Sequence, residues 1–225
     1  MTAYAQGFFK EKAEYSFQFD QGDGIFGMSI GSRTKETPGF MEVSGLDKFN
    51  LYLTDGKIQS EFSIGDPDAT KFHGALIYEP LTHSEYYWEV NMQAVSVGSI
   101  RVDLPASQTI VDSGTPFIIL SLDDSTRINT AIGAKLNSTM QVFTIDCELA
   151  KTAPPIAFQL SNGIYSVPSH VYISRQGNLC ISHIGWFGAN DPSGQRNILG
   201  VTFLRAMYSH WDREGKRIGF APAVY

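Results

Sequence analysis

One short segment combines a carboxylate, two hydroxyls and a glycine at the end of a predicted strand. Ile110 and Val111 are β-branched, and they predict a strand that is buried on both faces. Residues 112–115 read Asp-Ser-Gly-Thr, and the glycine allows a sharp turn where a Cβ atom would clash. The turn therefore predicts that Asp112 is held rigidly among hydroxyl and backbone N–H groups. A carboxylate in such a place can act as a general acid or base.

Other motifs that suggest chemistry lack the surroundings that their chemistry needs. Gly22, Gly24 and Gly27 form a GxGxxG motif, but no helical pattern follows, so the motif does not predict a dinucleotide site. Ser113 stands outside any GxSxG motif and is not predicted to be a serine nucleophile. The five histidines are scattered without an HExxH motif, so we expect no metal site.

The composition places the chain among globular proteins. Its 225 residues suffice for one sizeable domain or two small ones, and 43% are hydrophobic against 18% charged. The formal net charge of -6 at pH 7 argues against nucleic acid or an anionic membrane as the main partner. No apolar run approaches the roughly 18 residues of a transmembrane helix, so we expect no membrane span.

The elements that must position Asp112 are mainly strands. Alternating patterns and short apolar runs between turns predict strands at residues 15–19, 49–53, 76–78, 86–94, 142–145, 156–160, 164–167 and 171–173. One helix is predicted at about 122–136, because Ser121 fits an N-cap and Ile128, Ile132 and Leu136 share one face. The predicted fold class is therefore all-β with one main helix.

The two cysteines, Cys147 and Cys180, leave two interpretations open when only the residues are considered. They are either two free thiols or a disulfide that closes a loop of about 34 residues and stabilises the fold by roughly 3–4 kcal/mol. A disulfide would indicate an oxidising compartment. Asn137 begins the glycosylation sequon Asn-Ser-Thr, which fits a secreted protein.

Segment 110–115 resembles the active-site loop of the pepsin-like aspartic peptidases, in which two apolar residues precede Asp-Ser/Thr-Gly-Ser/Thr. Five further segments resemble this family in the same order along the chain. They are Asp-Gly-Ile-Phe-Gly-Met at 23–28, Phe-Asn-Leu-Tyr-Leu at 49–53, Tyr-Trp at 87–88, Ile-Leu-Gly at 198–200 and Gly-Phe-Ala at 219–221. The resemblance implies an acid-protease lobe of antiparallel strands, present as the C-terminal lobe with the end of the N-terminal lobe.

The resemblance also implies a role for each residue of the loop. Asp112 looks like the second-lobe catalytic aspartate, and Ser113 stands where a hydroxyl grips the opposite loop. Gly114 gives the turn, Thr115 stands where a hydroxyl bonds the outer carboxylate oxygen, and Ile110 faces a substrate pocket. In the family two such carboxylates share one proton and activate a water against a peptide bond, and no cofactor is needed.

Pairing of Cys147 with Cys180 is implied as well, because their separation resembles that of the second-lobe disulfide of the family. The resemblance further implies a secreted, lysosomal or vacuolar location. The first ten residues nevertheless lack a basic start followed by an apolar core, so the sequence shows no signal peptide.

The first lobe is largely absent from the sequence. No second Asp-Ser/Thr-Gly and no Tyr-Gly-Ser/Thr-Gly flap motif occurs in the 225 residues. We therefore expect residues 1–40 to be a remnant of the N-terminal lobe and residues 41–225 to be the C-terminal lobe. A complete pair of carboxylates would need the missing N-terminal lobe or a second copy of the chain, and the substrate would be a protein or peptide.

Three interpretations of function stay open at this point. The chain is a truncated aspartic endopeptidase that is inactive as a monomer, or a homodimer in which each copy supplies Asp112, as in retroviral peptidases. The third is a non-catalytic binding or inhibitory module on a peptidase-like scaffold. Val201, which replaces the usual Asp after Ile-Leu-Gly, and the altered stretch 78–85 favour this third interpretation. Because the normal partner surface of the lobe is uncovered when the chain is isolated, we expect an exposed apolar surface on the Asp112 side.

Overall fold

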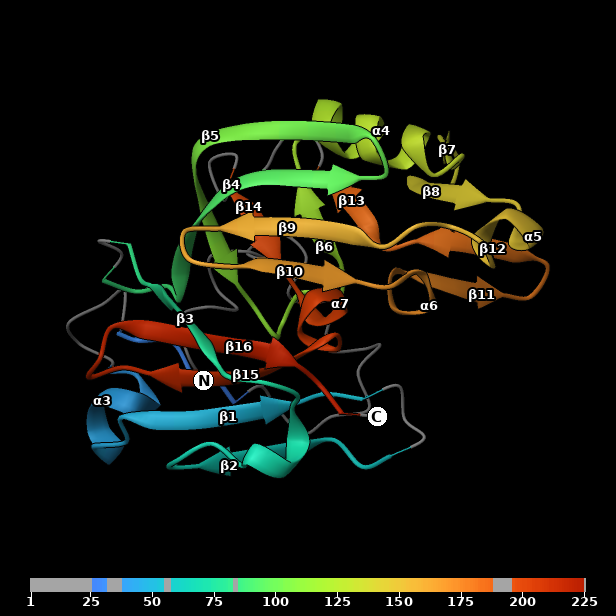
Figure 1. Cartoon of the computed structure of the whole chain (residues 1–225). Coiled ribbons are helices and arrows are strands. Elements are labelled where there is room, and N and C mark those ends of the chain that lie inside the picture. Colours follow the sequence, from blue (N-terminus) through green and yellow to red (C-terminus); the bar gives the residue numbers. More distant parts are fainter. Residues whose placement is uncertain (1–25, 32–37, 55–57, 83–84, 188–195, 225) are drawn as a thin grey trace.

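The computed structural model describes residues 26–31, 38–54, 58–82, 85–187 and 196–224. The strands of these residues form three sheets, and the helices are short (Figure 1). The predicted all-β fold class is therefore confirmed, with several short helices beside the one main helix that was predicted. The strand predicted at residues 15–19 and two glycines of the GxGxxG motif, Gly22 and Gly24, lie outside the described residues.

The five-stranded sheet forms the lower layer in Figure 1. Its order is β2 (Glu61–Ile64), β1 (Lys48–Tyr52), β15 (Met207–Asp212), β16 (Arg217–Pro222) and β3 (Ile77–Pro80), and all neighbours are antiparallel. The helix α3 (Phe40–Ser44) precedes β1, and a 3-10 turn (Ala69–Lys71) lies between β2 and β3.

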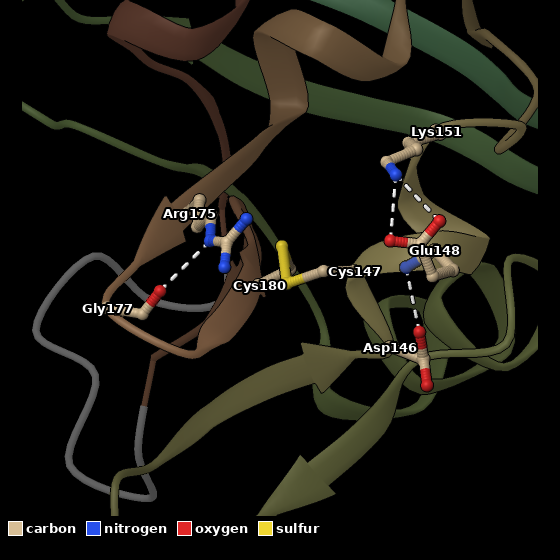
Figure 2. Close-up of a disulfide and its surroundings, with 7 residues drawn as sticks. All are labelled: Asp146, Cys147, Glu148, Lys151, Arg175, Gly177 and Cys180. Atoms are coloured by element: carbon tan, nitrogen blue, oxygen red, sulfur yellow. Dashed lines mark hydrogen bonds and ion pairs between the residues drawn. A yellow bond between two sulfur atoms is a disulfide. The ribbon is translucent and has the colours of Figure 1, made fainter.

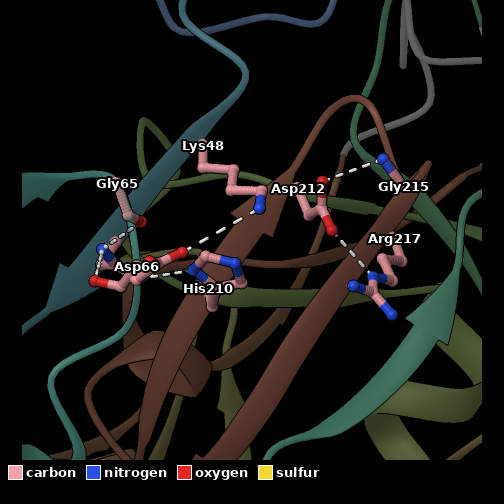
Figure 3. Close-up of polar contacts among 8 residues, drawn as sticks. Lys48, Gly65, Asp66, His210, Asp212, Gly215 and Arg217 are labelled. Carbon is pink, nitrogen blue, oxygen red and sulfur yellow. Dashed lines mark hydrogen bonds and ion pairs between the residues drawn. The ribbon is translucent and has the colours of Figure 1, made fainter.

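A polar cluster lies on one face of this sheet (Figure 3). The Asp212 carboxylate accepts hydrogen bonds from the Gly215 backbone N–H at 2.9 Å and from Arg217 Nε at 2.8 Å. Burial alone would raise the pKa of Asp212, but these two donors outweigh it and lower the pKa. The contacts of Asp212 therefore stabilise the fold above the carboxyl's unfolded pKa, and this contribution is lost only as the pH falls through the lower, folded pKa.

The seven-stranded sheet carries the candidate loop. Its order is β10 (Ile164–Val167), β9 (Ile156–Leu160), β4 (Glu89–Val97), β5 (Ile100–Val111), β14 (Asn197–Leu199), β6 (Ile118–Leu120) and β13 (Ile184–Trp186). Most neighbours are antiparallel, as expected, but β14 pairs with β5 and β13 pairs with β6 in parallel. Asp112 follows β5, so it lies next to the end of β14.

The four-stranded sheet has the order β11 (Ile173–Gln176), β12 (Leu179–Ser182), β8 (Val142–Ile145) and β7 (Lys135–Asn137). Two single-turn helices, α5 (Cys147–Ala150) and α6 (Ser169–Tyr172), adjoin it. Figure 2 shows the disulfide between Cys147, at the start of α5, and Cys180 in β12, with the two Cα atoms 5.3 Å apart. The predicted pairing of the two cysteines is confirmed.

The predicted main helix is present as α4 (Leu122–Ala131) and is shorter than the predicted range of 122–136. Ser121 is its N-cap, and the Ser121 Oγ accepts the Asp124 N–H at 3.1 Å. The helix ends early because Gly133 has a φ of +82°, which L side chains rarely adopt. Ile128 is buried as predicted, but Leu136 belongs to β7 and is 44% exposed. None of the helices in the described part of the chain has the length and apolar character needed to cross a bilayer.

Most predicted strands lie close to the observed ones. Those predicted at 142–145, 156–160 and 164–167 have these bounds as β8, β9 and β10, whereas those at 49–53, 76–78 and 86–94 are shifted by one to three residues. The strand predicted at 171–173 is wrong at its start, because Val171 lies in α6. The Pro168 carbonyl accepts the Val171 N–H at 3.0 Å and closes a helical turn there.

An aromatic cluster joins the two larger sheets. Phe203, in the short helix α7 (Val201–Leu204), packs edge to face against Phe158 of β9, Tyr165 of β10 and Phe220 of β16, with ring centroids 5.3–6.0 Å apart. All four side chains are at most 3% exposed. Burial of aromatic rings on this scale fixes the two sheets, and with them α7, in one arrangement.

Candidate active site

The Asp112 carboxylate is held by the two residues that the sequence places after Ser113. The Gly114 backbone N–H donates to Asp112 Oδ1 at 2.8 Å, and the Thr115 hydroxyl donates to Asp112 Oδ2 at 2.6 Å. A Cβ atom on Gly114 would lie 3.1 Å from Asp112 Oδ1, so the glycine allows this close approach. Both carboxylate oxygens therefore have a fixed donor, and the side chain stays partly exposed.

Backbone hydrogen bonds with β14 and α7 hold the Asp112 loop in place. The Asp112 N–H donates to the Leu199 carbonyl at 3.1 Å, which continues the pairing of β5 with β14. The first N–H groups of α7 donate to the loop, from Val201 to the Thr115 carbonyl at 2.8 Å and from Thr202 to the Pro116 carbonyl at 3.0 Å. The first N–H groups of a helix have no partner within the helix, so here the loop satisfies them.

Gly200, the N-cap of α7, makes this contact possible. A Cβ atom on Gly200 would lie well inside 3.0 Å of the carbonyl oxygens of both Thr115 and Phe117. These are backbone atoms and cannot swing aside as a flexible side chain would. The glycine of the Ile-Leu-Gly segment is therefore required for close packing of α7 under the loop.

Asp112 lies in the wall of a cavity of about 320 Å³. Most of the lining is apolar and aromatic, and it comes from the segment before α3, from β1, β2 and β15, from the three residues just before β4, and from the end of β5 with the Asp112 loop. The lining residues are Phe26, Gly27, Met28, Ser29, Phe49, Leu51, Phe62, Tyr86, Tyr87, Trp88, Val111, Asp112, Ser113, Gly114 and Trp211. A mostly apolar hollow with one carboxylate is the usual form of a binding site for an organic ligand.

The surface beside the cavity is apolar too. Phe62 and Ile64 on the edge strand β2 are 45% and 57% exposed, and Phe26 is 64% exposed. This agrees with the apolar surface expected on the Asp112 side. The sequence alone indicates no role for the aromatic walls of the cavity, although Trp88 belongs to a segment that resembles the family. Trp88 is fixed there by a hydrogen bond from its Nε1 to the Met28 carbonyl at 2.7 Å.

Ile110 and Ser113 occupy different surroundings. Ser113 is exposed and lines the cavity, which leaves its hydroxyl accessible to a partner group. Ile110 is 2% exposed and packs with Tyr87 and Ile198, whereas Val111 is the strand residue that lines the cavity. The substrate contact expected of Ile110 stays a prediction.

Asn137 lies at the end of β7, in the turn that leads to β8. Its Oδ1 accepts the N–H groups of Thr139 and Met140, each at 3.1 Å. The sequon is therefore in a surface turn, which is the usual setting of a glycosylation acceptor. Glycosylation of Asn137 stays a prediction.

Replacing Val201 with aspartate is expected to stabilise the chain. Arg205 Nε is buried without a hydrogen-bond partner among the described residues, and Val201 lies one helical turn before it. A carboxylate at position 201 is expected to form an ion pair with Arg205 and to lie at the positive end of α7. Together these two interactions should stabilise the folded chain by about 0.5–1 kcal/mol. We expect the melting temperature to rise by about 1–4 °C. Val201→Asn is the uncharged control, and equal melting of the two variants would contradict the expectation.

Sequence comparisons relate this chain to a known protein family. The family model described as eukaryotic aspartyl protease matches residues 2–223. Probable vacuolar protease A of Arthroderma benhamiae is 33% identical over 99% of this chain and 58% of its own length. Chymosin of Callithrix jacchus is 30% identical over 92% of this chain and 55% of its own length, and pepsin II-2/3 of Oryctolagus cuniculus is 30% identical over 97% and 58%.

The chain thus spans a little over half the length of these curated relatives. The family model covers nearly the whole chain, and the matched part includes the Asp112 loop and the Ile-Leu-Gly segment that supports it. The chain belongs to the eukaryotic aspartyl protease family.

Proposed function

We propose that this chain supplies the second lobe of a pepsin-like aspartic endopeptidase, with Asp112 as one of two catalytic carboxylates. In this proposal residues 41–225 form the C-terminal lobe, and residues 1–40 belong to the end of the N-terminal lobe. The substrate is a protein or peptide, and the bond that breaks is a peptide bond.

The observation that carries the proposal is the fixed carboxylate of Asp112 in the wall of an apolar cavity. Oδ1 and Oδ2 each accept one hydrogen bond, from Gly114 and from Thr115, so the carboxylate is oriented before any substrate arrives. Orientation of a reacting group in advance lowers the barrier because little reorganisation remains. The apolar walls suit the hydrophobic side chains of a bound peptide.

The chemistry needs a second carboxylate. Two carboxylates close together cannot both ionise, so they share one proton, and one takes a proton from water while the other donates a proton to the peptide carbonyl. The sequence contains one Asp-Ser/Thr-Gly segment, so the second carboxylate comes from a first lobe or from another copy of the chain. A lone Asp112 is not expected to hydrolyse peptides.

A chimera is expected to show whether Asp112 is catalytic. The second lobe of the Arthroderma benhamiae relative is replaced by residues 41–225, which gives a single chain with two lobes. We expect cleavage of an unfolded protein substrate at acid pH, and a loss of at least about 100-fold in the Asp112→Asn variant. Cooperative melting of both proteins serves as the control for folding.

Two results would count against this role. A chimera that melts cooperatively but does not cleave the substrate would favour a non-catalytic binding or inhibitory module, for which the substitution at Val201 is the sequence evidence. Equal activity of the wild-type and Asp112→Asn chimeras would exclude Asp112 as the catalytic group. Cleavage by the natural chain alone, rising faster than its concentration, would favour the homodimer.

The proposal includes passage through the secretory pathway to a secreted, lysosomal or vacuolar destination. The disulfide between Cys147 and Cys180 supports an oxidising compartment. The turn position of Asn137 supports its use as a glycosylation acceptor there. Loss of mass on treatment with a glycosidase specific for N-linked glycans, absent in Asn137→Gln, tests this part separately.

A further inference from the structure

His183 lies behind the candidate loop, where the four-stranded sheet meets the seven-stranded sheet. It stands between β12 and β13, its N–H donates to the Tyr172 carbonyl at 2.8 Å, and its carbonyl accepts the Ile118 N–H at 2.9 Å. Both backbone groups are therefore fixed. The ring is placed among Phe117, Ser174 and Thr202, which belong to three separate segments of the chain.

The hydrogen bonds around the ring determine its tautomer. The Thr202 hydroxyl donates to the Pro116 carbonyl at 2.9 Å, so its oxygen can only accept from His183 Nδ1, which is 3.2 Å away. Nδ1 must then carry the proton, and Nε2 of the neutral ring is an acceptor. Ser174 Oγ, 2.7 Å from Nε2, is the donor to it.

The result is a continuous chain of donated hydrogen bonds that runs from Ser174 through His183 and Thr202 to the carbonyl of Pro116. Aligned hydrogen bonds polarise and strengthen one another. The ring of Phe117 stacks on the imidazole, with centroids 4.9 Å apart and an interplanar angle of 10°. His183 thus contacts Phe117 directly and is linked to Pro116 through Thr202. Pro116 and Phe117 are the two residues that follow Thr115.

The surroundings favour the neutral ring that this chain of bonds requires. Burial, and secondarily the positive charge of Arg205, hold the pKa of His183 below its ordinary value. Since Nε2 accepts rather than donates, Ser174 keeps its donor role as long as the ring is neutral.

We propose that His183 is a positioning residue that fixes residues 115–117, and through them the hydroxyl that Thr115 donates to Asp112. This role in catalysis rests on the proposed peptidase function, whereas the hydrogen-bond chain itself does not. Pro116 is held twice from α7, by the N–H and by the hydroxyl of Thr202. His183 orients that hydroxyl, and it braces the far side of the turn through Phe117.

Two substitutions distinguish the hydrogen bond that Nδ1 donates to Thr202 from the other contacts of the His183 ring. In His183→Asn the side-chain nitrogen falls near the place of Nδ1 and can still donate to Thr202. In His183→Gln it falls near Nε2, on the Ser174 side, and the donor to Thr202 is lost. Both variants lose the stacking on Phe117, and they differ in the end of the hydrogen-bond chain that they keep. His183→Asn keeps the bond to Thr202 and His183→Gln keeps the contact with Ser174, so a defect confined to His183→Gln reports the bond to Thr202.

The first test uses the natural chain and needs no activity. Nitrogen-15 spectra of His183 should show the proton on Nδ1. Hydrogen exchange at the N–H groups of Val201 and Thr202 should be about two- to tenfold faster in His183→Gln than in His183→Asn. The amide of Val95, in the pairing of β4 with β9, belongs to none of the segments that contact the His183 ring, so it is the reference and should exchange equally in both variants.

The second test uses the two-lobe chimera. We expect His183→Gln to lower kcat by about tenfold or more with little change in KM, and His183→Asn to recover most of that loss. A proton on Nε2, equal exchange at Thr202 in the two variants, or equal acceleration at Val95 would overturn the positioning role. If the unsubstituted chimera is inactive, the proposed function fails, and the spectra and exchange rates still decide the role of His183.

Discussion

Replacing Gly200 with alanine is expected to destabilise the chain by about 3 kcal/mol or more. The added Cβ atom would overlap the backbone carbonyl oxygens of Thr115 and Phe117, so relief requires movement of the loop or of α7. Movement of α7 is costly because Phe203, the third residue of the helix, is buried in the aromatic cluster between the larger sheets. We therefore expect the loop to move.

Displacement of the loop also changes the candidate site. The bonds from Val201 and Thr202 to the loop carbonyls are the ones that a Cβ atom on Gly200 would push apart. A shift of about 1 Å in a positioning segment can cost 100-fold in rate, so activity of the two-lobe chimera should fall by at least that factor. The measurements are thermal unfolding of the natural chain and substrate cleavage by the chimera.

Gly39→Ala is the matched control for this substitution. Gly39 has a φ of -69°, and a Cβ atom there meets nothing closer than the Glu42 carboxylate at 3.5 Å. Alanine is a poorer N-cap than glycine, so a cost of up to about 1 kcal/mol is expected for α3 alone. If Gly200→Ala melts as the control does, the packing of α7 under the loop does not constrain the loop in the way described.

The Asp112 loop could be predicted from sequence because its geometry is local. Gly114 and Thr115 reach the Asp112 carboxylate from two and three residues away, so the hexapeptide alone specifies these bonds. The extent of α4 was less predictable. Leu136 continues the apolar spacing of Ile128 and Ile132, which predicts that it lies on the same helix face. The helix ends before Gly133, however, so Leu136 is not part of it.

The support beneath the loop could not be predicted, because it joins segments that are far apart in the sequence. Gly200 contacts Thr115 only because β14 inserts between β5 and β6, and no local pattern indicates a parallel pair at that point. The same holds for His183, whose partners come from three segments that only the tertiary fold brings together. Sequence alone identified it as one scattered histidine among five.

Removing the disulfide with the double substitution Cys147→Ser and Cys180→Ser is expected to cost about 3–4 kcal/mol, because the unfolded chain then gains the freedom of a loop of about 34 residues. For a chain of this size we expect the melting temperature to fall by roughly 10 °C. The four-stranded sheet should loosen first, since the disulfide ties α5, which follows β8, to β12 within that sheet.

Reduction of the natural protein is the matched control for the double variant. Dithiothreitol should lower the melting temperature of the natural chain by a similar amount and leave the double variant unchanged. Hydrogen exchange should accelerate most at the pairing of β12 with β8, where Cys180 faces Ile145, and least in the five-stranded sheet. Because His183 directly follows β12, its bond to Thr202 should weaken with that sheet. Uniform acceleration over all three sheets would instead mean that the disulfide stabilises the chain only as a whole.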